Sequence, residues 1–407
     1  MGNESIVESR KYYQRNKMLS VMRFHEDVSR YDVKKLTGYS MTTVLNTIDE
    51  MIKEGLIYEE MCGESRVGRK PIWLRVNPEG GYFIGVEFNG RLMHCVVLDF
   101  KGNQIHSLET PIAEKNSRAN EVIQMLKDII RQALDYLGNR QLKVVGIGLG
   151  VPGYSSKKEG IAISYNHFKD WDNIPLKQII EEEFHFPCYM DNNVNVMIFA
   201  YKWLVYHGRC EDMLFVSVRT GARVMPIINN TPVSSTYGFP GELGHVKVRG
   251  GSRICSCGRY GCLNSEISDF AIVSKIQDGI RVRRYKEILE MVNGDKDAIT
   301  IATFVDSVIQ GHQDSLNLMH QVAGFLGETL SMLVNIFAPR KIVFYGELAR
   351  IGEPFFEILR KNVWENSIKE NNKGLQIMAS EFGRNLGAIG AAALVMQEAF
   401  DFVEETI

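Results

Sequence analysis

The spacing of hydrophobic residues along this chain changes near residue 78. Before that point, apolar positions recur every three or four residues, which is typical of amphipathic helices. After it, short apolar runs that are typical of buried strands alternate with helical patterns. The change predicts a small, mainly helical domain over residues 1–78 and a larger α/β part behind it.

Two helices are expected at the front of the small domain. The stretch 9–24 has apolar residues at near-helical spacing. These residues are Tyr13, Met18, Leu19 and Met22. A second, short helix follows Ser29, which makes a capping-box pair with Asp32, and Gly38 ends it.

A third helix is expected after one turn, with Ser40 as its N-cap and Gly55 as its stop signal. Its inward face consists of Val44, Ile48 and Met51. Two short helices joined by a tight glycine turn outline a helix-turn-helix, a motif that binds DNA. The candidates for DNA contact on the outward face are Thr42, Thr43 and Asn46.

A wing is expected after these helices. Two strand-like stretches, 56–61 and 71–76, flank a polar loop whose cations Arg66, Arg69 and Lys70 are candidates for contacts to DNA phosphates. The alternative for the whole segment is a small helical interaction domain, because helix-turn-helix outlines arise often by chance.

The larger part shows two similar passes of strands followed by helices. The first pass predicts strands at 81–89, 92–100, 103–112 and 143–153 with a helix at 120–137. The second predicts two strands within 212–233, a helix at 314–337, a strand at 340–347 and a helix at 385–400. Two similar lobes with a ligand cleft between them would explain this repetition.

These patterns predict three domains. Residues 1–78 form a winged helix-turn-helix domain, residues 79–200 the first lobe, and residues 201–385 the second lobe with a metal loop. The closing helix, 386–407, is rich in small residues and is expected to return to the first lobe as one alternative.

Composition narrows the class of protein. With 407 residues, 45% of them hydrophobic, the chain has ample material for several buried cores. The net charge of −2 is too small to argue for nucleic acid by itself. Because no apolar run approaches the roughly 20 residues that cross a bilayer, we expect a cytoplasmic protein without membrane contact.

Three of the seven cysteines are concentrated in one short segment. Cys255, Cys257 and Cys262 lie close behind His245, which supplies an imidazole beside three thiolates. In a reducing compartment this set favours a tetrahedral Zn²⁺ site over disulfides. Four protein ligands leave no open coordination position, which predicts a structural metal. The alternative is a reduced, cysteine-rich surface turn.

Six motifs in this order resemble the ROK family of sugar kinases and repressors. They are "GVEFNG" (85–90), "GIGLGVPG" (146–153), "DNNVN" (191–195), "GELGH" (241–245), "CSCGRYGC" (255–262) and "GAIGAAAL" (387–394). The front, including "GRKP" (68–71), resembles the winged-helix domain of the repressor branch. The resemblance implies a two-lobed α/β actin-like ATPase (ribonuclease H-like) fold behind the α+β winged helix. It also implies zinc at the four residues above, a sugar pocket between the lobes, and a homodimer or homotetramer.

The resemblance also implies the residues that contact a sugar. In the family, an Asn after the "PG" loop, an Asn-Asp pair, and the Glu and His of "GELGH" contact sugar hydroxyls. The matching positions here are Asn166, Asn192, Asn193, Glu242 and His245. Taken singly, each also fits an ordinary loop-capping residue. One position departs from the family, since Asn264 stands where the family often has Glu, with Glu266 two residues on.

The kinase pattern of the family is missing at four places, which predicts that no residue is catalytic. The family's catalytic Asp falls on Asn193, and an amide cannot act as a general base. The two phosphate loops are "EFNGR" (87–91) and "RTGAR" (219–223), and the paired Gly-Gly of the adenosine region is Tyr345-Gly346. Arg219 and Arg223 replace glycines, so an anionic effector such as a sugar phosphate stays an alternative.

The leading hypothesis is a repressor of carbohydrate-utilisation genes that binds a double-stranded DNA operator and responds to a sugar or sugar phosphate. The second hypothesis is an ATP-dependent sugar kinase with an attached regulatory domain. A third is a DNA-binding scaffold that has lost its ligand and answers to a protein partner.

Overall fold

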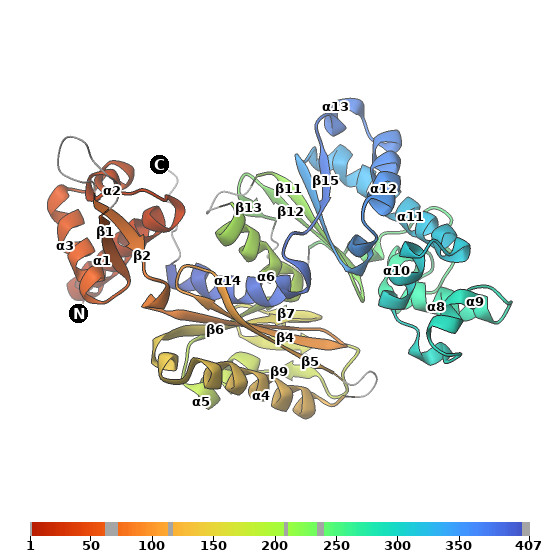
Figure 1. Cartoon of the computed structure of the whole chain (residues 1–407), viewed down its shortest axis with the longest axis horizontal. Helices are drawn as coiled ribbons and strands as arrows, with labels where there is room; N and C mark the ends of the chain where they lie inside the picture. The colour runs from red at the N-terminus through yellow and green to blue at the C-terminus, as the bar shows by residue number, and fades with distance from the viewer. Residues whose placement is uncertain (1, 62–71, 113–116, 207–210, 234–239, 401–407) are drawn as a thin grey trace. The chain divides into compact units, whose positions relative to one another are not determined.

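The computed structural model describes residues 2–61, 72–112, 117–206, 211–233 and 240–400 of the 407 (Figure 1). The chain divides into two compact units. The first consists of Met1–Arg209 with Arg384–Ile407, and the second of Cys210–Gly383. The predicted limits of the three domains, at residues 78, 200 and 385, stay predictions.

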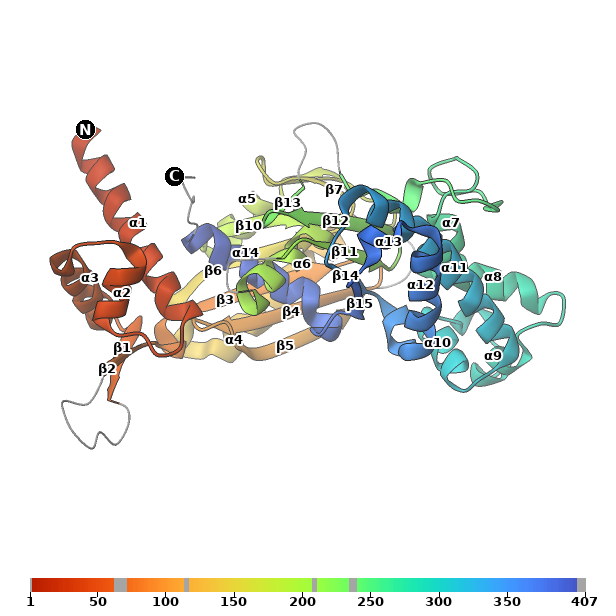
Figure 2. The ribbon, with the colours of Figure 1, turned by 90° about the horizontal axis from the view of Figure 1, so that it is seen from above.

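The first unit begins with the predicted small domain of three helices and two strands (Figure 2). Its elements are α1 (Gly2–Phe24), α2 (Arg30–Thr37), α3 (Met41–Lys53), β1 (Ile57–Met61) and β2 (Ile72–Val76). The strands pair antiparallel, with Ile57 opposite Val76. The loop between them, with Arg66, Arg69 and Lys70, lies outside the described residues.

The predicted caps of α2 and α3 are present. The Ser29 backbone N–H donates to Asp32 Oδ2 at 3.0 Å, and the Asp32 N–H donates to Ser29 Oγ at 3.3 Å. Hydrogen bonds from Ser29 lower the pKa of the Asp32 carboxyl. Gly38 ends α2 at φ 75°, where a side chain would be strained. Ser40 Oγ accepts from the Thr43 N–H at 3.2 Å.

The inward faces agree with the sequence pattern except at one residue. Val44, Ile48 and Met51 are fully buried, and so are Met18 and Leu19, whose side chains are at most 2% exposed. Tyr13 is exposed, however, and its grouping with the apolar face of α1 was wrong. Asn16 is buried instead, because it hydrogen-bonds to the closing helix of the chain.

The main sheet of the first unit has five strands in the order β10-β6-β3-β4-β5. They are β3 (Tyr82–Phe88), β4 (Leu92–Asp99), β5 (Gln104–Pro111), β6 (Val144–Val151) and β10 (Cys188–Asn192). Figure 1 shows α4 (Ala119–Leu137) on one face and α6 (Asn193–Ala200) with α14 (Leu386–Phe400) on the other. The strands β3, β6 and β10 are mutually parallel, so their carboxyl ends meet at one edge.

The sequence patterns did not predict several short elements of this unit. A second sheet has the order β7-β8-β9, and a further helix and a π-helical turn also belong to the unit. These elements are β7 (Tyr154–Ser156), β8 (Ile161–Ser164), β9 (Asp172–Ile174), α5 (Leu176–Phe184) and the turn Tyr201–Val205.

Helix α14 lies unusually close to the sheet. A Cβ atom on Gly148 of β6 would lie 1.8 Å from the Ala391 carbonyl oxygen, and one on Gly85 of β3 would lie 2.1 Å from the Ala388 oxygen. No real contact is that short, so only glycine fits at either position. The small residues of "GAIGAAAL" therefore let helix backbone rest directly on strand backbone.

The far end of α14 contacts α1. Tyr12 OH and Asn16 Nδ2 both donate to the Ala399 carbonyl oxygen, the second at 3.2 Å. Arg23, near the end of α1, donates to the Phe100 carbonyl oxygen and lies 5.4 Å from the centroid of the Phe400 ring. Burial lowers the pKa of Arg23 to about 10. The small domain is thus attached to α14 and to the β4–β5 turn.

The second unit is built on another five-stranded sheet, in the order β13-β12-β11-β14-β15. Its strands are β11 (Met213–Val218), β12 (Ala222–Ile228), β13 (Thr231–Pro232), β14 (Lys341–Tyr345) and β15 (Gln376–Ala379). Its helices are α7 (Asn264–Ile267), α8 (Asp269–Ile280), α9 (Lys286–Met291), α10 (Ile301–Ile309), α11 (Gln313–Phe337), α12 (Glu353–Asn366) and α13 (Lys369–Asn372). The predicted long helix at 314–337 corresponds to α11.

Among the residues that the structure describes, no helix combines the length and the apolar composition that crossing a membrane requires.

Replacing Gly148 by alanine is expected to destabilise the first unit, because the new methyl group would overlap the Ala391 carbonyl oxygen. We expect a loss of about 3 kcal/mol, as for severe overpacking, seen as a lower thermal midpoint. Gly324→Ala in α11 is the matched control, since a Cβ there meets open space and alanine favours a helix by about 1 kcal/mol. Equal midpoints for the two variants would contradict the close packing of α14.

Candidate metal centre and ligand-binding residues

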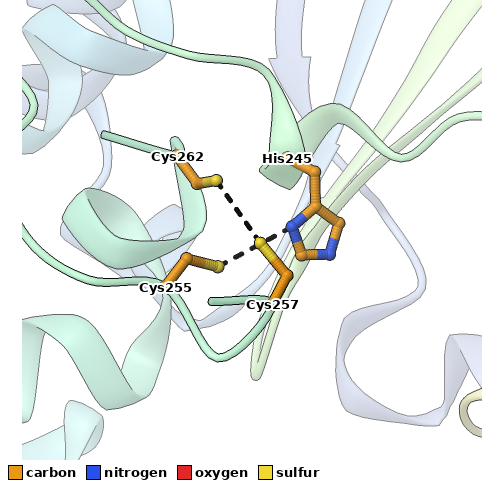
Figure 3. Close-up of side chains that lie close together, drawn as sticks. All are labelled: His245, Cys255, Cys257 and Cys262. Atoms are coloured by element: carbon orange, nitrogen blue, oxygen red, sulfur yellow. Dashed lines mark hydrogen bonds between the residues drawn. The ribbon is translucent and has the colours of Figure 1, made fainter. Parts of the chain in front are cut away.

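The structure brings the four predicted metal ligands together in the second unit (Figure 3). His245 ends a short 3₁₀ turn, Leu243–His245, and the three cysteines lie on the loop that follows. The ligand atoms of His245, Cys255, Cys257 and Cys262 all lie within 4.8 Å of one another. Such a group can hold a metal ion.

Backbone geometry explains how so short a loop brings the cysteines together. Gly258 and Gly261 adopt φ values of 82° and 72°, which glycine alone adopts without strain. The Cys255 N–H donates to the Arg259 carbonyl oxygen at 2.8 Å and closes the tip of the loop. The two glycines therefore let the loop turn sharply enough to bring the three cysteines to one place.

Two distances within the cluster are close to those between the ligands of a tetrahedral zinc ion. The sulfurs of Cys257 and Cys262 are 3.7 Å apart, and Cys255 Sγ is 3.7 Å from His245 Nδ1 (dashed lines in Figure 3). Ligands at normal zinc bond lengths and tetrahedral angles give roughly 3.8 Å between two sulfurs and roughly 3.6 Å between sulfur and nitrogen. The donor set and its spacing therefore suit Zn²⁺.

The thiols of the cluster differ in acidity. A hydrogen bond from the Arg259 backbone lowers the pKa of exposed Cys257 to about 7, whereas burial raises the pKa of Cys262 to about 12. A bound cation would favour the thiolate form of both cysteines.

Two polar residues behind the cluster hold its loop to the rest of the unit. Glu266 is 4% exposed and accepts from the backbone N–H groups of Ser252 and Arg253 and from Lys275 Nζ, the last at 2.6 Å. Asn264 Oδ1 accepts from the Ala222 N–H at 2.7 Å. Both side chains therefore accept hydrogen bonds from backbone N–H groups. Glu266, the acid two residues after the family's usual Glu position, holds the backbone of the cysteine loop.

Glu242 and His245 lie next to each other. The Glu242 carboxylate receives a hydrogen bond from Arg223 Nη2 at 2.7 Å on Oε1, and its Oε2 lies 3.8 Å from His245 Nε2. Since His245 Nδ1 faces Cys255, one imidazole ring touches both the metal cluster and a predicted sugar ligand. The sequence pattern identified Arg223 as a residue that replaces a glycine of the family's phosphate loop, but it did not predict this ion pair.

The predicted ligands of the first unit follow its parallel strands. Asn193, the first residue of α6, donates from Nδ2 to Glu87 Oε1 at 3.2 Å, and both side chains are buried. Asn192 caps α6 by accepting from the Val194 N–H and donates to the Gly153 carbonyl oxygen. These residues lie at the carboxyl ends of β3, β6 and β10, the edge where α/β sheets commonly bind ligands.

Asn166 lies apart from those contacts, exposed in the turn that follows β8. Glu87 is the residue that the sequence analysis missed as a contact of Asn193. Its position in "EFNGR", the counterpart of a kinase phosphate loop, could have marked Glu87 as a site residue. The contact itself was not predictable, because Asn193 lies 106 positions away in the sequence.

The DNA-contact candidates on α3 differ in exposure. Thr42 and Asn46 are exposed, whereas Thr43 is half-buried and its hydroxyl lies 2.8 Å from Ser40 Oγ. Thr43 thus supports the N-terminal cap of the helix. Thr42 and Asn46 remain the α3 candidates whose side chains reach solvent.

Comparisons with known proteins show which family the chain resembles over most of its length. Residues 83–398 match the model of the ROK family. The xylose repressor of Caldicellulosiruptor bescii is 29% identical over 406 residues, which cover 99% of this chain and 100% of that protein. A glucokinase of Halalkalibacterium halodurans is 25% identical over 320 residues, covering 78% of this chain and 96% of the enzyme.

A solved structure gives the same result for the fold. The crystal structure of a ROK family transcriptional regulator, described as a homologue of the E. coli MLC protein, has a TM-score of 0.80 at 20% identity. The match covers 96% of this chain and 97% of that one. The predicted fold class is confirmed, a winged-helix domain followed by the two-lobed actin-like fold.

Replacing Cys255 by serine is expected to remove the metal and to lower the thermal midpoint by about 5 °C or more, because one thiolate ligand is lost. Metal content by mass spectrometry and thermal unfolding measure the two effects. Ser256→Ala changes an exposed neighbour in the same loop and should retain the metal. Full metal content in Cys255→Ser would rule out this ligand set.

Proposed function

Because the chain belongs to the ROK family, we propose that it is a sugar-responsive transcriptional repressor that binds a DNA operator. The observation that carries the proposal is the small domain α1–β2 in front of the two-lobed part. The xylose repressor aligns over both parts, whereas the glucokinase aligns over 320 residues only. An exposed recognition helix joined to the family's fold is what a repressor needs.

In this proposal α3 enters the major groove and presents Asn46 and Thr42 to the base edges. An Asn side chain can pair with adenine through two hydrogen bonds. The cations of the wing, Arg66, Arg69 and Lys70, contact phosphates on either side. A homodimer would place two such helices on two operator half-sites. Binding to DNA is consistent with the expected location in the cytoplasm.

The effector is a sugar, bound by Asn166, Asn192, Asn193, Glu242 and His245. Planar amides and carboxylates that donate and accept in pairs are suited to neighbouring hydroxyls. Support comes from the position of Asn192 and Asn193 at the carboxyl ends of the parallel strands and from the proximity of Glu242 to His245.

The proposed regulator does not transfer phosphate. A kinase needs a carboxylate to accept the proton of the sugar hydroxyl, and Asn193 offers an amide that is already bonded to Glu87. Zinc is proposed as a structural ion at His245, Cys255, Cys257 and Cys262, since four protein ligands leave no position for substrate. Its role is to hold the loop beside Glu242.

The sugar response reaches the DNA-binding domain through α14. This helix begins beside Glu87, which a Cβ on Gly387 would touch at 2.5 Å, and ends at Ala399, which accepts hydrogen bonds from α1. A cavity of about 640 Å³ lies beside the α1 contact and is lined by Arg23, Lys101 and Trp203 among others. A sugar that binds one conformation better then shifts the orientation of α3.

The experiment that tests the proposal is fluorescence anisotropy of the purified chain on DNA that flanks its gene, with and without a panel of sugars. We expect salt-dependent, sequence-preferring binding that one sugar changes. Asn46→Ala should weaken specific binding by about 1–3 kcal/mol through loss of base contacts. Asn120→Ala, an exposed Asn on α4, is the control and should bind normally.

Two results would contradict the repressor. The first is equal affinity for all DNA sequences at every salt concentration. The second is sugar-dependent release of ADP by the natural chain, which would favour the kinase alternative.

Asn16→Ala is expected to change the sugar response more than DNA binding itself, because it removes one of the bonds between α1 and α14. We expect affinity for the operator to stay within about threefold while the sugar-induced change falls severalfold. Lys11→Ala changes an exposed residue of the same helix and serves as the control, which should behave like the natural chain. Parallel losses of operator affinity and sugar response would argue that α14 does not couple the two.

A further inference from the structure

Arg223 and Glu242 form an ion pair that two neighbouring segments hold in place. Arg223 Nη2 lies 2.7 Å from Glu242 Oε1, and the two side chains are only 18% and 32% exposed. The Val224 N–H donates to the Gly241 carbonyl oxygen at 2.9 Å, so the backbones next to both residues are also joined. The pair therefore has a defined geometry and is partly shielded from water.

The two carboxylate oxygens of Glu242 have different surroundings. Oε1 accepts from Arg223, whereas Oε2 lies 3.8 Å from His245 Nε2. A carboxylate held at one oxygen by a guanidinium keeps lone pairs for hydrogen-bond donors but has its charge compensated. It then suits a neutral hydroxyl and gives little advantage to a cation.

We infer that Arg223 is a specificity-determining residue that orients Glu242 and restricts the effector to uncharged sugars. The inference rests on the proposed function, in which Glu242 contacts the sugar. An ammonium group of an amino sugar would approach Arg223, and this like-charge repulsion selects against it. Without Arg223, Glu242 would be an uncompensated anion that attracts the same ammonium group.

The same geometry argues against an anionic effector held by the two arginines of "RTGAR". Arg223 is engaged with Glu242, and the guanidinium of Arg219 lies 5.5 Å from the centroid of the Tyr345 ring. A phosphate that used Arg223 would have to break the ion pair and leave Glu242 facing another negative charge. The pair therefore favours neutral sugars over sugar phosphates.

Isothermal titration calorimetry of the full-length, metal-loaded chain tests the inference with matched ligands. The probes are D-xylose and D-glucose, the 2-amino and 3-amino deoxy analogues of each, and glucose 6-phosphate. The measured quantity is the ratio of the dissociation constants of each amino sugar and its neutral parent. It is compared in five proteins: the natural chain, Arg223→Gln, Arg223→Lys, Glu242→Gln and the Arg223→Gln/Glu242→Gln double variant.

The natural chain should bind at least one neutral sugar and discriminate against its amino analogues. In Arg223→Gln this discrimination should fall about tenfold for at least one amino analogue, and Arg223→Lys should retain most of it because the positive charge remains. In Glu242→Gln the guanidinium of Arg223 is no longer compensated, so discrimination against the amino analogues should exceed that of the natural chain, and it should fall again in the double variant. Metal content should stay unchanged, which separates this role from support of the fold.

Distinct results overturn the two proposals. If the natural chain binds no neutral sugar, the proposed effector class is wrong and the role of Arg223 is wrong with it. If a neutral sugar binds and Arg223→Gln leaves its discrimination against both amino analogues unchanged, the role of Arg223 alone is wrong. Tighter binding of glucose 6-phosphate than of glucose would also overturn it.

Discussion

The packing of helix backbone against strand backbone at Gly85 and Gly148 is the constraint on which the first unit depends. A single methyl group at either position would push α14 off the sheet. Because the helix rests on β3 and β6 without intervening side chains, its position follows the strands closely. The same strands carry Glu87 and lead to the "PG" loop, so α14 connects the carboxyl-terminal edge of the parallel strands to α1.

In the second unit the metal loop plays the corresponding part. The four candidate ligands are close in sequence and include His245, which lies next to Glu242. Asn264, two residues after Cys262, joins the loop to Ala222, the first residue of β12. Small movements of the loop would therefore change the position of Glu242. An ion bound by the four residues would therefore also fix the position of Glu242.

Much of this architecture could be predicted from the sequence, because local signals determine it. The capping box at Ser29 and Asp32, the glycine at the end of α2 and the buried stripe of α3 depend on neighbours in the chain. The metal cluster is local in the same sense, with all its ligands within eighteen residues. The short strands β7, β8 and β9 were missed, since so few residues show no clear period.

The contacts around the proposed sugar-binding residues could not be predicted in this way. Glu87 and Asn193 are 106 positions apart, and Arg223 and Glu242 meet only because β12 and the Gly241 backbone are joined. The pairing of Tyr12 and Asn16 with Ala399 spans almost the whole chain. Such contacts depend on tertiary packing, and the fact that Tyr13 is exposed while Asn16 is buried has the same cause.

The orientation of the His245 ring has a consequence for recognition. A neutral imidazole carries one proton, which either nitrogen can hold, so a free histidine presents a donor or an acceptor according to its tautomer. A cation bound at Nδ1 leaves that proton on Nε2, the atom that faces Glu242. In the proposed sugar site His245 would then offer a fixed donor next to a fixed acceptor, and the direction of the hydrogen bonds that a ligand must match would be set before the ligand binds.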